Sequence, residues 1–204
     1  LMGLWSKYPI TTPINVIMNS SSNEAKFSDY LEEMKKRGMK ILPPSINKSG
    51  IIFQIEKDSL LFPLSFINGV NELLVNNIVK ERTENGPFKG FFDFAVRMYS
   101  YKINESQFTA LVNSGALDEL YKSRASMLST IKNALMYAQL CYSEDGQLNI
   151  GIAPFAEPAM AEEDDDPLTD LDKEFEALGI MLSKNPLEFK QDLLKEKNVT
   201  YIQD

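Results

Sequence analysis

The sequence has no histidine and a single cysteine, Cys141, among its 204 residues. Without histidine, the Ser-His-Asp and Cys-His nucleophile systems and the usual zinc ligand sets cannot form, and there is no imidazole for acid-base catalysis. A lone cysteine rules out an internal disulfide, which fits a reducing compartment. These absences exclude many classes of enzyme.

No apolar run approaches the roughly 20 residues that a membrane-spanning helix needs. The first residues also lack the basic region, apolar stretch and cleavage site of a secretory signal. We therefore expect a soluble, cytoplasmic protein with no membrane partner. The chain starts at Leu1 and not at a methionine, and we expect it to be an internal piece of a longer protein.

Positive charge is scarce in the last third of the chain, and the net charge is -8. Residues 141–204 hold 5 Lys and Arg against 16 Asp and Glu, whereas residues 1–140 hold 16 against 13. The acidic part repels a polyanion such as DNA, and the rest of the chain does not. Any contact with nucleic acid is therefore expected in the first two-thirds.

Hydrophobic residues recur mostly at helical spacing, which predicts a mainly α-helical protein with one small β-hairpin. Two short apolar runs, 51–55 and 60–62, flank a polar turn and are expected to form that hairpin. Pro43 and Pro44 predict a rigid connector at 42–47, because neither can donate a backbone hydrogen bond. Helices are expected near residues 13–19, 27–38, 64–71, 74–82, 88–96, 104–113, 123–141, 167–178 and 186–194.

The segment from Leu64 to Arg82 has the helix, glycine turn and helix of a helix-hairpin-helix motif. Gly69 allows DNA to approach closely, and the next helix then points free N–H groups and the positive end of its dipole at a phosphate. Asn71, which tolerates left-handed geometry, replaces the usual second glycine. A glycine between helices is more often a plain structural turn, so this motif alone leaves both interpretations open.

A second and fainter glycine turn lies at 111–117, with two basic residues just beyond it. Two copies of the motif favour binding to the DNA backbone, with amides supplied by both turns and charge by basic side chains. The candidate DNA-binding residues are Asn68, Gly69, Val70, Asn71, Arg82, Ser114, Gly115, Lys122 and Arg124.

Residues 143–166 are rich in Gly, Pro, Ala, Glu and Asp without lasting periodicity, which predicts a linker between two packing units. Five consecutive carboxylates run from Glu162 to Asp166. Phosphoryl transfer needs carboxylates that converge on metal ions, whereas consecutive side chains diverge. We therefore interpret the run as a solvated linker, without a metal site, in which Asp166 caps the next helix. That helix is expected to bury one apolar face, formed by Leu168, Leu171, Phe175 and Leu178.

Several short motifs follow one another along nearly the whole chain: Lys7–Pro9, Tyr30–Asn47, Ile67–Val70, Phe88–Arg97, Asn104–Leu111, Ser114–Asp118 and Glu174–Gly179. The stretch LPPSIN at 42–47 is the most specific of them. In this order the motifs resemble the C-family replicative DNA polymerases of bacteria, the polymerase III alpha subunits.

The resemblance implies a division of the chain into four parts. These are the end of the polymerase fingers at 1–50, a β-hairpin with a tandem helix-hairpin-helix DNA-binding unit at 51–141, an acidic linker at 142–166, and C-terminal helices at 167–204 that lead toward an OB-fold. It also implies a DNA-directed DNA polymerase of chromosome replication, with the primer-template duplex as partner. The palm that holds magnesium ions would lie upstream, so neither catalytic residues nor cofactors are expected here.

The family also carries a peptide that binds the sliding clamp, typically a glutamine followed by aliphatic and aromatic anchors. Gln147, Leu148 and Ile150 stand at the corresponding place, although Gly151 replaces the final aromatic residue. By this resemblance the sliding clamp is a second expected partner.

The net charge favours a rival hypothesis from another class, a helical adaptor that binds only proteins. Its acidic part would meet a basic surface, and both glycine turns would be structural. Salt dependence separates the two hypotheses, because binding to the DNA backbone weakens steeply with salt, whereas an adaptor binds no duplex even at low salt.

Overall fold

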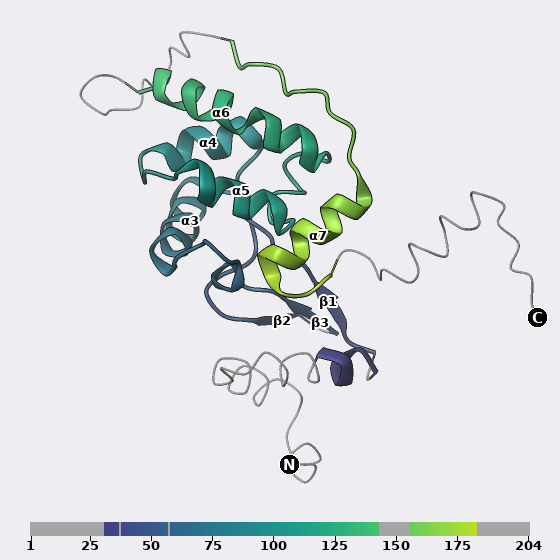
Figure 1. Ribbon diagram of the computed structural model, residues 1–204. Coiled ribbons are helices and arrows are strands. Elements are labelled where there is room, and N and C mark those ends of the chain that lie inside the picture. The colour runs from purple at the N-terminus through teal and green to yellow at the C-terminus, as the bar shows by residue number, and fades with distance from the viewer. Residues whose placement is uncertain (1–30, 37, 57, 143–155, 183–204) are drawn as a thin grey trace, which may run out of the picture.

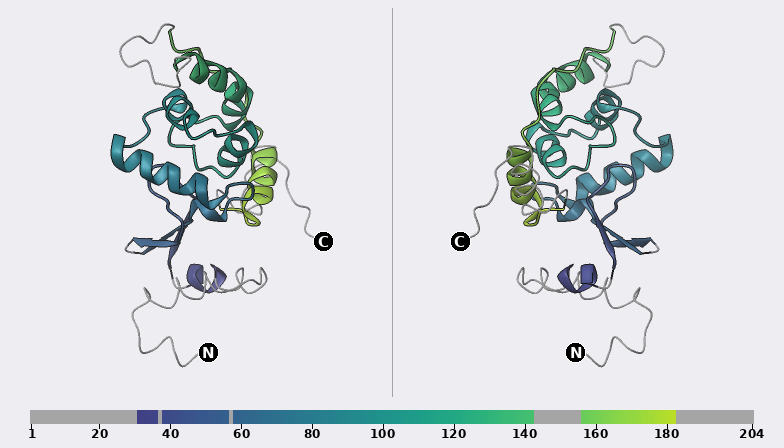
Figure 2. Two further views of the ribbon diagram at one scale, coloured as in Figure 1. Left: turned by 90° about the vertical axis from the view of Figure 1, so that its left-hand side faces the viewer. Right: turned by 90° about the vertical axis from the view of Figure 1, so that its right-hand side faces the viewer.

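A computed structural model describes residues 31–36, 38–56, 58–142 and 156–182. A group of α-helices lies on one side of a small β-sheet, and the helical residues 31–36 lie beyond the sheet (Figures 1 and 2). The expected class, mainly helical with a small β-structure, is confirmed. The helices expected near 13–19 and 186–194 lie outside the described residues.

The sheet contains β1 (Lys40–Leu42), β2 (Gln54–Glu56) and β3 (Ser59–Leu61), in the order β1-β3-β2. The antiparallel pair of β2 and β3, with Ile55 opposite Leu60, confirms the expected hairpin. Strand β1, which was not predicted, pairs in parallel with β3 and includes only Leu42 of the expected connector; residues 43–47 form neither helix nor strand. The prolines follow the strand, and Pro43 favours the extended geometry that Leu42 adopts in it. The sheet thus joins residues on both sides of the boundary expected at residue 50.

A small hydrophobic cluster packs the first described helical residues against the sheet. Leu31 and Met34, three positions apart on the helix, are buried with Phe53, Leu60 and Phe62. The rings of Phe53 and Phe62 meet edge to face with centroids 5.0 Å apart, a geometry that aromatic pairs prefer. The helical spacing in the sequence therefore indicates the buried face of this helix correctly.

Helices follow the sheet along the chain: η1, a 3-10 turn (Leu64–Phe66), α3 (Glu72–Asn85), α4 (Phe91–Tyr99), α5 (Glu105–Asn113), α6 (Arg124–Leu140) and α7 (Pro167–Leu178). The capping box expected at α5 is present: Asn104 Oδ1 accepts from the Gln107 amide at 2.9 Å, and Gln107 Oε1 accepts from the Asn104 amide at 3.2 Å. Ser123 caps α6, also as expected. Within the described ranges, none of the helices combines the length and apolar character that crossing a bilayer requires.

The main hydrophobic core lies between these helices, with α6 packed against α4 and α5. Phe91 and Phe94 of α4 contact Phe108 of α5, with ring centroids 4.9 and 5.2 Å apart. All three rings are buried. They stabilise the fold and cannot stack on bases.

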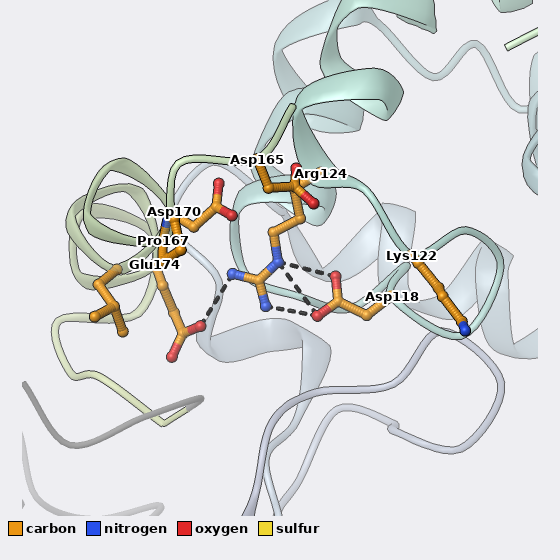
Figure 3. Close-up of a pocket in the computed structure, with 8 residues that line it drawn as sticks. Asp118, Lys122, Arg124, Asp165, Pro167, Asp170 and Glu174 are labelled. Carbon is orange, nitrogen blue, oxygen red and sulfur yellow. Dashed lines mark hydrogen bonds and ion pairs between the residues drawn. The ribbon is translucent and has the colours of Figure 1, made fainter. Parts of the chain in front are cut away.

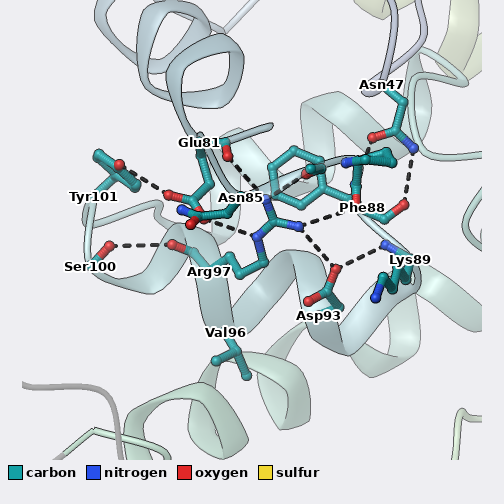
Figure 4. Close-up of polar contacts among 12 residues, drawn as sticks. Asn47, Glu81, Asn85, Phe88, Lys89, Asp93, Val96, Arg97, Ser100 and Tyr101 are labelled. Atoms are coloured by element: carbon teal, nitrogen blue, oxygen red, sulfur yellow. Dashed lines mark hydrogen bonds and ion pairs between the residues drawn. The ribbon is translucent and has the colours of Figure 1, made fainter. Parts of the chain in front are cut away.

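Arg97 of α4 joins that helix to the end of α3 (Figure 4). Its Nε donates to Glu81 Oε1 at 2.9 Å, Nη2 donates to the carbonyl of Gly86 at 2.8 Å, and the guanidinium lies 4.3 Å from the centroid of the Phe88 ring. Burial acts to raise the pKa of Glu81, but hydrogen bonds from Arg97 and neighbouring side chains outweigh it and lower that pKa. The ionised pair therefore stabilises this corner of the fold.

Helix α7 belongs to the same core as the other helices, because Ala177 and Leu178 are buried in it. The expected separation into two packing units is therefore wrong for this helix. The residues before it, 156–166, form neither helix nor strand and run along α6 (Figure 1). The Ala161 amide donates to Thr130 Oγ1 of α6 at 2.9 Å, so hydrogen bonds hold this segment in place.

The buried face of α7 matches the expected one only in part: Leu171 and Leu178 are buried as expected. Leu168 and Phe175 are 54% and 51% exposed, whereas Glu174 is completely buried. The reason is electrostatic: Glu174 forms an ion pair with Arg124 at 3.0 Å, which turns the Glu174 side of the helix inward. Hydrophobic periodicity alone cannot indicate a buried carboxylate whose partner is distant in sequence.

Candidate nucleic-acid interface

The first glycine turn connects η1 to α3. Gly69 is exposed and has a φ of +87°, which residues with a side chain rarely adopt. Asn71 has φ -88° and ψ 162°, so the left-handed geometry expected for it is wrong. It is instead the N-cap of α3, and its Oδ1 accepts a hydrogen bond from the Leu74 amide at 2.8 Å. The turn therefore consists of one glycine bend and an immediate helix start.

This turn and the start of α3 present a row of unpaired amides. The amides of Gly69, Asn71, Glu72 and Leu73 have no hydrogen-bond acceptor among the residues that the structure describes. All four residues are exposed, and Leu73 is 69% exposed. Free amides at a helix N-terminus carry partial positive charge and bind anions, phosphate among them.

Glu72 and Leu73 are absent from the residues expected at the interface. The signal that could have found them is Asn71, because the two residues after an N-cap begin the helix with free amides. The helical pattern in the sequence instead begins at Leu74, the first buried residue of α3. An exposed leucine in the first turn adds no periodic signal.

Two residues of the first turn use their amides within the protein. Asn68 donates from its amide to the Ala177 carbonyl and from its side chain to the Glu176 carbonyl, both at 2.9 Å. Val70 is buried, and its amide donates to the Ile67 carbonyl at 3.0 Å. The Val70 amide, which was expected to contact phosphate, is therefore paired within the protein, as are the amide and the side chain of the candidate residue Asn68. Asn68 instead attaches the turn to the C-terminal end of α7.

The second glycine turn is closed. Ser114 and Gly115 are both buried. Three successive amides, those of Ser114, Gly115 and Ala116, donate at 3.0–3.1 Å to the carbonyls of Ala110, Val112 and Leu111. The expected presentation of Ser114 and Gly115 amides to DNA is therefore wrong in this structure. Gly115, with φ +78°, serves internal packing.

Arg124 covers Gly115 and is itself buried (Figure 3). Its Nε and Nη2 donate to the two carboxylate oxygens of Asp118 at 2.9 and 2.6 Å, and Nη1 donates to Glu174 at 3.0 Å. Burial acts to lower the pKa of Arg124, but the two carboxylates outweigh it and raise that pKa. The guanidinium is thus held in an internal ion pair, so its expected role in attracting phosphate is wrong.

Arg82 and Lys122 are the other two basic residues expected at the interface. Arg82 donates to the carbonyls of Ile46 and Lys48 at 2.6 and 3.1 Å, and burial lowers its pKa. It therefore attaches the segment after β1 to α3. Lys122 is exposed, and its side chain points away from Arg124 (Figure 3). Of the three, Lys122 is the one that is open to solvent.

The acidic run reaches the start of α6, a contact for which the sequence holds no local signal. Asp165 Oδ1 accepts from the Ala125 amide at 2.8 Å and from the Ser123 hydroxyl at 3.0 Å. Asp166 caps α7 as expected, since its Oδ1 accepts from the Leu168 amide at 3.3 Å. Neighbouring carboxylates thus cap two different helices. The residues expected to bind the clamp, Gln147, Leu148 and Ile150, lie outside the described residues.

A comparison with protein families matches residues 38–127 to a helix-hairpin-helix motif. This range contains both glycine turns and the sheet. The match therefore agrees with the turn-and-helix geometry around Gly69 and Gly115.

Among curated proteins, the DNA polymerase III subunit alpha of Bacillus subtilis (strain 168) is 37% identical over 98% of the chain. The subunits of the same name from Thermus aquaticus and Staphylococcus aureus (strain MRSA252) are 31% and 34% identical over 88% and 90% of the chain. The chain spans only 15–18% of the length of these three relatives.

Proposed function

We propose that this chain, which belongs to the family of DNA polymerase III alpha subunits, holds duplex DNA by its phosphate backbone through the first glycine turn. The observation that carries the proposal is the row of free amides at Gly69, Asn71, Glu72 and Leu73. A glycine turn that only connects two helices does not require four backbone amides, on exposed residues, that lack hydrogen-bond acceptors.

The chemistry of these donors fits a phosphodiester. Its oxygens accept hydrogen bonds, and its charge is stabilised by the positive end of the α3 dipole. Without a Cβ, Gly69 allows the sugar-phosphate chain to come close to the backbone. Backbone amides recognise phosphate and sugar but not base edges, so we expect binding that is independent of sequence.

The position of the turn is fixed by the rest of the fold. The Asn68 hydrogen bonds attach it to α7, and the buried Val70 anchors it in the core. A turn that is already ordered loses little conformational entropy when DNA binds. The Glu72 carboxylate lies at the same helix end and opposes a phosphate, so we expect moderate affinity that depends strongly on salt.

For the whole polymerase we propose DNA-directed DNA synthesis in replication, with magnesium ions held by a palm outside these residues. The chain covers too small a share of its relatives for that activity to be assigned to it alone. Within the polymerase the first glycine turn would bind the backbone of the primer-template duplex and keep the duplex aligned with the palm. Clamp binding by Gln147, Leu148 and Ile150 stays a prediction.

Substitution of Leu73 tests the proposal without disturbing the fold. Leu73→Glu places a carboxylate in the first turn of α3, where it stabilises the helix but repels a phosphate. Met136→Glu is the matched control, because Met136 is 64% exposed and belongs to α6. Helix α6 lies on the side of the helical unit away from the sheet (Figure 1). Fluorescence anisotropy with a labelled duplex of about 20 base pairs at low salt measures both affinities.

We expect Leu73→Glu to bind on the order of tenfold more weakly than Met136→Glu, with a log-log salt slope shallower by about 0.9 for each phosphate that the variant no longer binds. Two duplexes of unrelated sequence should bind the unmodified chain equally. Equal affinities of the two variants would refute a contact at the first glycine turn. Absence of duplex binding by the unmodified chain at low salt would favour the adaptor hypothesis.

A further inference from the structure

The two glycine turns are followed by helices whose first turns are built alike. In α3, the N-cap residue Asn71 accepts from the amide three positions on, and in α6 Ser123 does the same. In both helices the amide four positions after the cap donates to the N-cap carbonyl. The second residues of the two helices, Leu73 and Ala125, therefore occupy equivalent positions.

The equivalent amides differ in what they contact. The Leu73 amide has no acceptor among the described residues, whereas the Ala125 amide donates to Asp165 at 2.8 Å. The same Asp165 oxygen accepts from the Ser123 hydroxyl, the side chain that caps α6. A carboxylate oxygen thus lies at the position on α6 where a phosphate oxygen would bind on α3.

The carboxylate is held there by the backbone of the segment that carries it. We name residues 161–166 the acidic strap. The Ser126 hydroxyl accepts from the Glu163 amide at 3.1 Å and donates to the Glu163 carbonyl at 3.2 Å, and the Ala161 amide donates to Thr130. The Ser123 hydroxyl also contacts the Glu163 carbonyl at 3.1 Å. Residues 162–166 are all exposed, so the strap is attached to α6 by hydrogen bonds and not by burial of its side chains.

We propose that the acidic strap is an intramolecular phosphate mimic: Asp165 occupies the N-terminus of α6 and keeps the start of this helix from contacting DNA. This inference rests on the proposed function, because it assumes that the equivalent amides of α3 bind phosphate. DNA is then held through the first turn alone, and it reaches α6 only when the strap leaves.

The charges around the strap agree with a displaceable contact. Asp165 shares a cleft with Asp118, Asp170 and Glu174, and Arg124 is the guanidinium between them (Figure 3). Burial raises the pKa of Asp170, and the neighbouring charge of Asp165 raises it further. The other carboxylates of the cleft therefore oppose the strap, while the α6 amides and the cationic Lys122 and Arg124 attract it.

A pair of charge-matched variants tests the proposal. Asp165→Asn removes the charge at α6, and Asp164→Asn removes the same charge next to it, from an exposed side chain that has no hydrogen-bond partner among the described residues. Asp165→Ala removes the acceptor as well, and Asp165→Glu keeps the charge. Duplex affinity and salt slope of the 204-residue chain are measured by anisotropy, with thermal melts to confirm that each variant folds.

We expect Asp165→Asn and Asp165→Ala to bind duplex at least about threefold more tightly than Asp164→Asn, with a salt slope steeper by about 0.9, the increment for one added phosphate. Asp165→Glu should bind like the unmodified chain. In NMR spectra the Ala125 amide should shift in Asp165→Asn and stay in place in Asp164→Asn.

The alternative results separate this inference from the proposed function. Duplex binding that is equal in Asp165→Asn and Asp164→Asn overturns the phosphate mimic and leaves the first turn as the DNA contact. Weaker binding by Asp165→Asn than by Asp164→Asn also overturns it, because the strap would then assist DNA binding. No binding by any variant at low salt overturns both proposals.

Discussion

The two glycine turns should respond very differently to the same substitution. An alanine Cβ at Gly69 would meet only the Cβ of Ala110, at an ordinary 3.6 Å. The same atom at Gly115 would overlap Nη2 of Arg124 and lie 3.1 Å from Asp118 Oδ2. Both glycines have positive φ, so both substitutions carry the same cost of left-handed backbone geometry. The difference between their losses of stability therefore measures how tightly the Arg124 guanidinium is packed.

The magnitudes follow from these contacts. Left-handed geometry costs alanine about 1–2 kcal/mol, which is the whole expected effect of Gly69→Ala. In Gly115→Ala the guanidinium must also move, although Asp118 and the buried Glu174 hold it at 2.6 and 3.0 Å. Loss of one partner of a buried ion pair costs roughly 3–5 kcal/mol, so Gly115→Ala should destabilise the fold by about 4 kcal/mol or more.

Urea denaturation followed by circular dichroism measures both free energies of unfolding. We expect Gly115→Ala to be at least about 2 kcal/mol less stable than Gly69→Ala, a margin that allows for partial relaxation of the arginine. Equal losses would mean that Arg124 moves aside freely. In that case the closed second turn would not depend on this ion pair.

Three further predictions concern other parts of the fold. Glu174→Gln should lose roughly 3 kcal/mol of stability in urea, because Arg124 loses its fully buried carboxylate partner, whereas the surface control Glu176→Gln should lose less than about 0.5 kcal/mol. The lowered pKa of Glu81 gives a stabilisation that is fully present above the ordinary pKa of this group and is lost as the pH falls through its lower pKa in the folded state. Thermal melts should therefore show that Glu81→Gln is less stable than the unmodified chain at neutral pH. The difference between the two proteins should become smaller below about pH 4.5. Asn104→Ala should reduce the free energy of unfolding by about 1 kcal/mol through loss of the α5 capping box, with unchanged stability as the contrary result.

Local signals in the sequence predict much of the fold because they act over a few residues. Three helices start at side-chain caps that the sequence indicates and the structure contains: Asn104 with Gln107 at α5, Ser123 at α6, and Asp166 before Pro167 at α7. The β2-β3 hairpin follows from two apolar runs around a polar turn. Caps and turns are determined by neighbours in the chain, so their identity can be inferred from the residues alone.

The errors arise where distant residues meet. Strand β1 depends on pairing with β3, and the buried position of Glu174 depends on Arg124, which is 50 residues away. Arg124 is an ordinary basic residue in the sequence and a buried ion-pair partner in the fold. Helical periodicity reports which residues are apolar but gives no information on which charges are neutralised by others.

The candidate site shows the same division. Gly69 and the helical patterns on either side of it predict the first turn, and the range that matches the helix-hairpin-helix family includes this turn. Arg124, which covers the second turn, pairs with Glu174 of α7, and Asp165 of the strap caps α6, so both partners come from the acidic part of the chain. Net charge along the sequence predicts that this part avoids DNA, whereas the structure places α7 against both turns, through the bonds of Asn68 to its backbone and the pair of Arg124 with Glu174.

The most direct test of the central claim is NMR of the 15N-labelled chain titrated with a duplex of arbitrary sequence. The amides of Gly69, Asn71, Glu72 and Leu73 should shift first and furthest, to the same extent with a second, unrelated duplex, and should return toward their free positions as salt rises. Shifts that leave these four amides unchanged and gather elsewhere on the chain would contradict the assignment of the first glycine turn as the DNA contact.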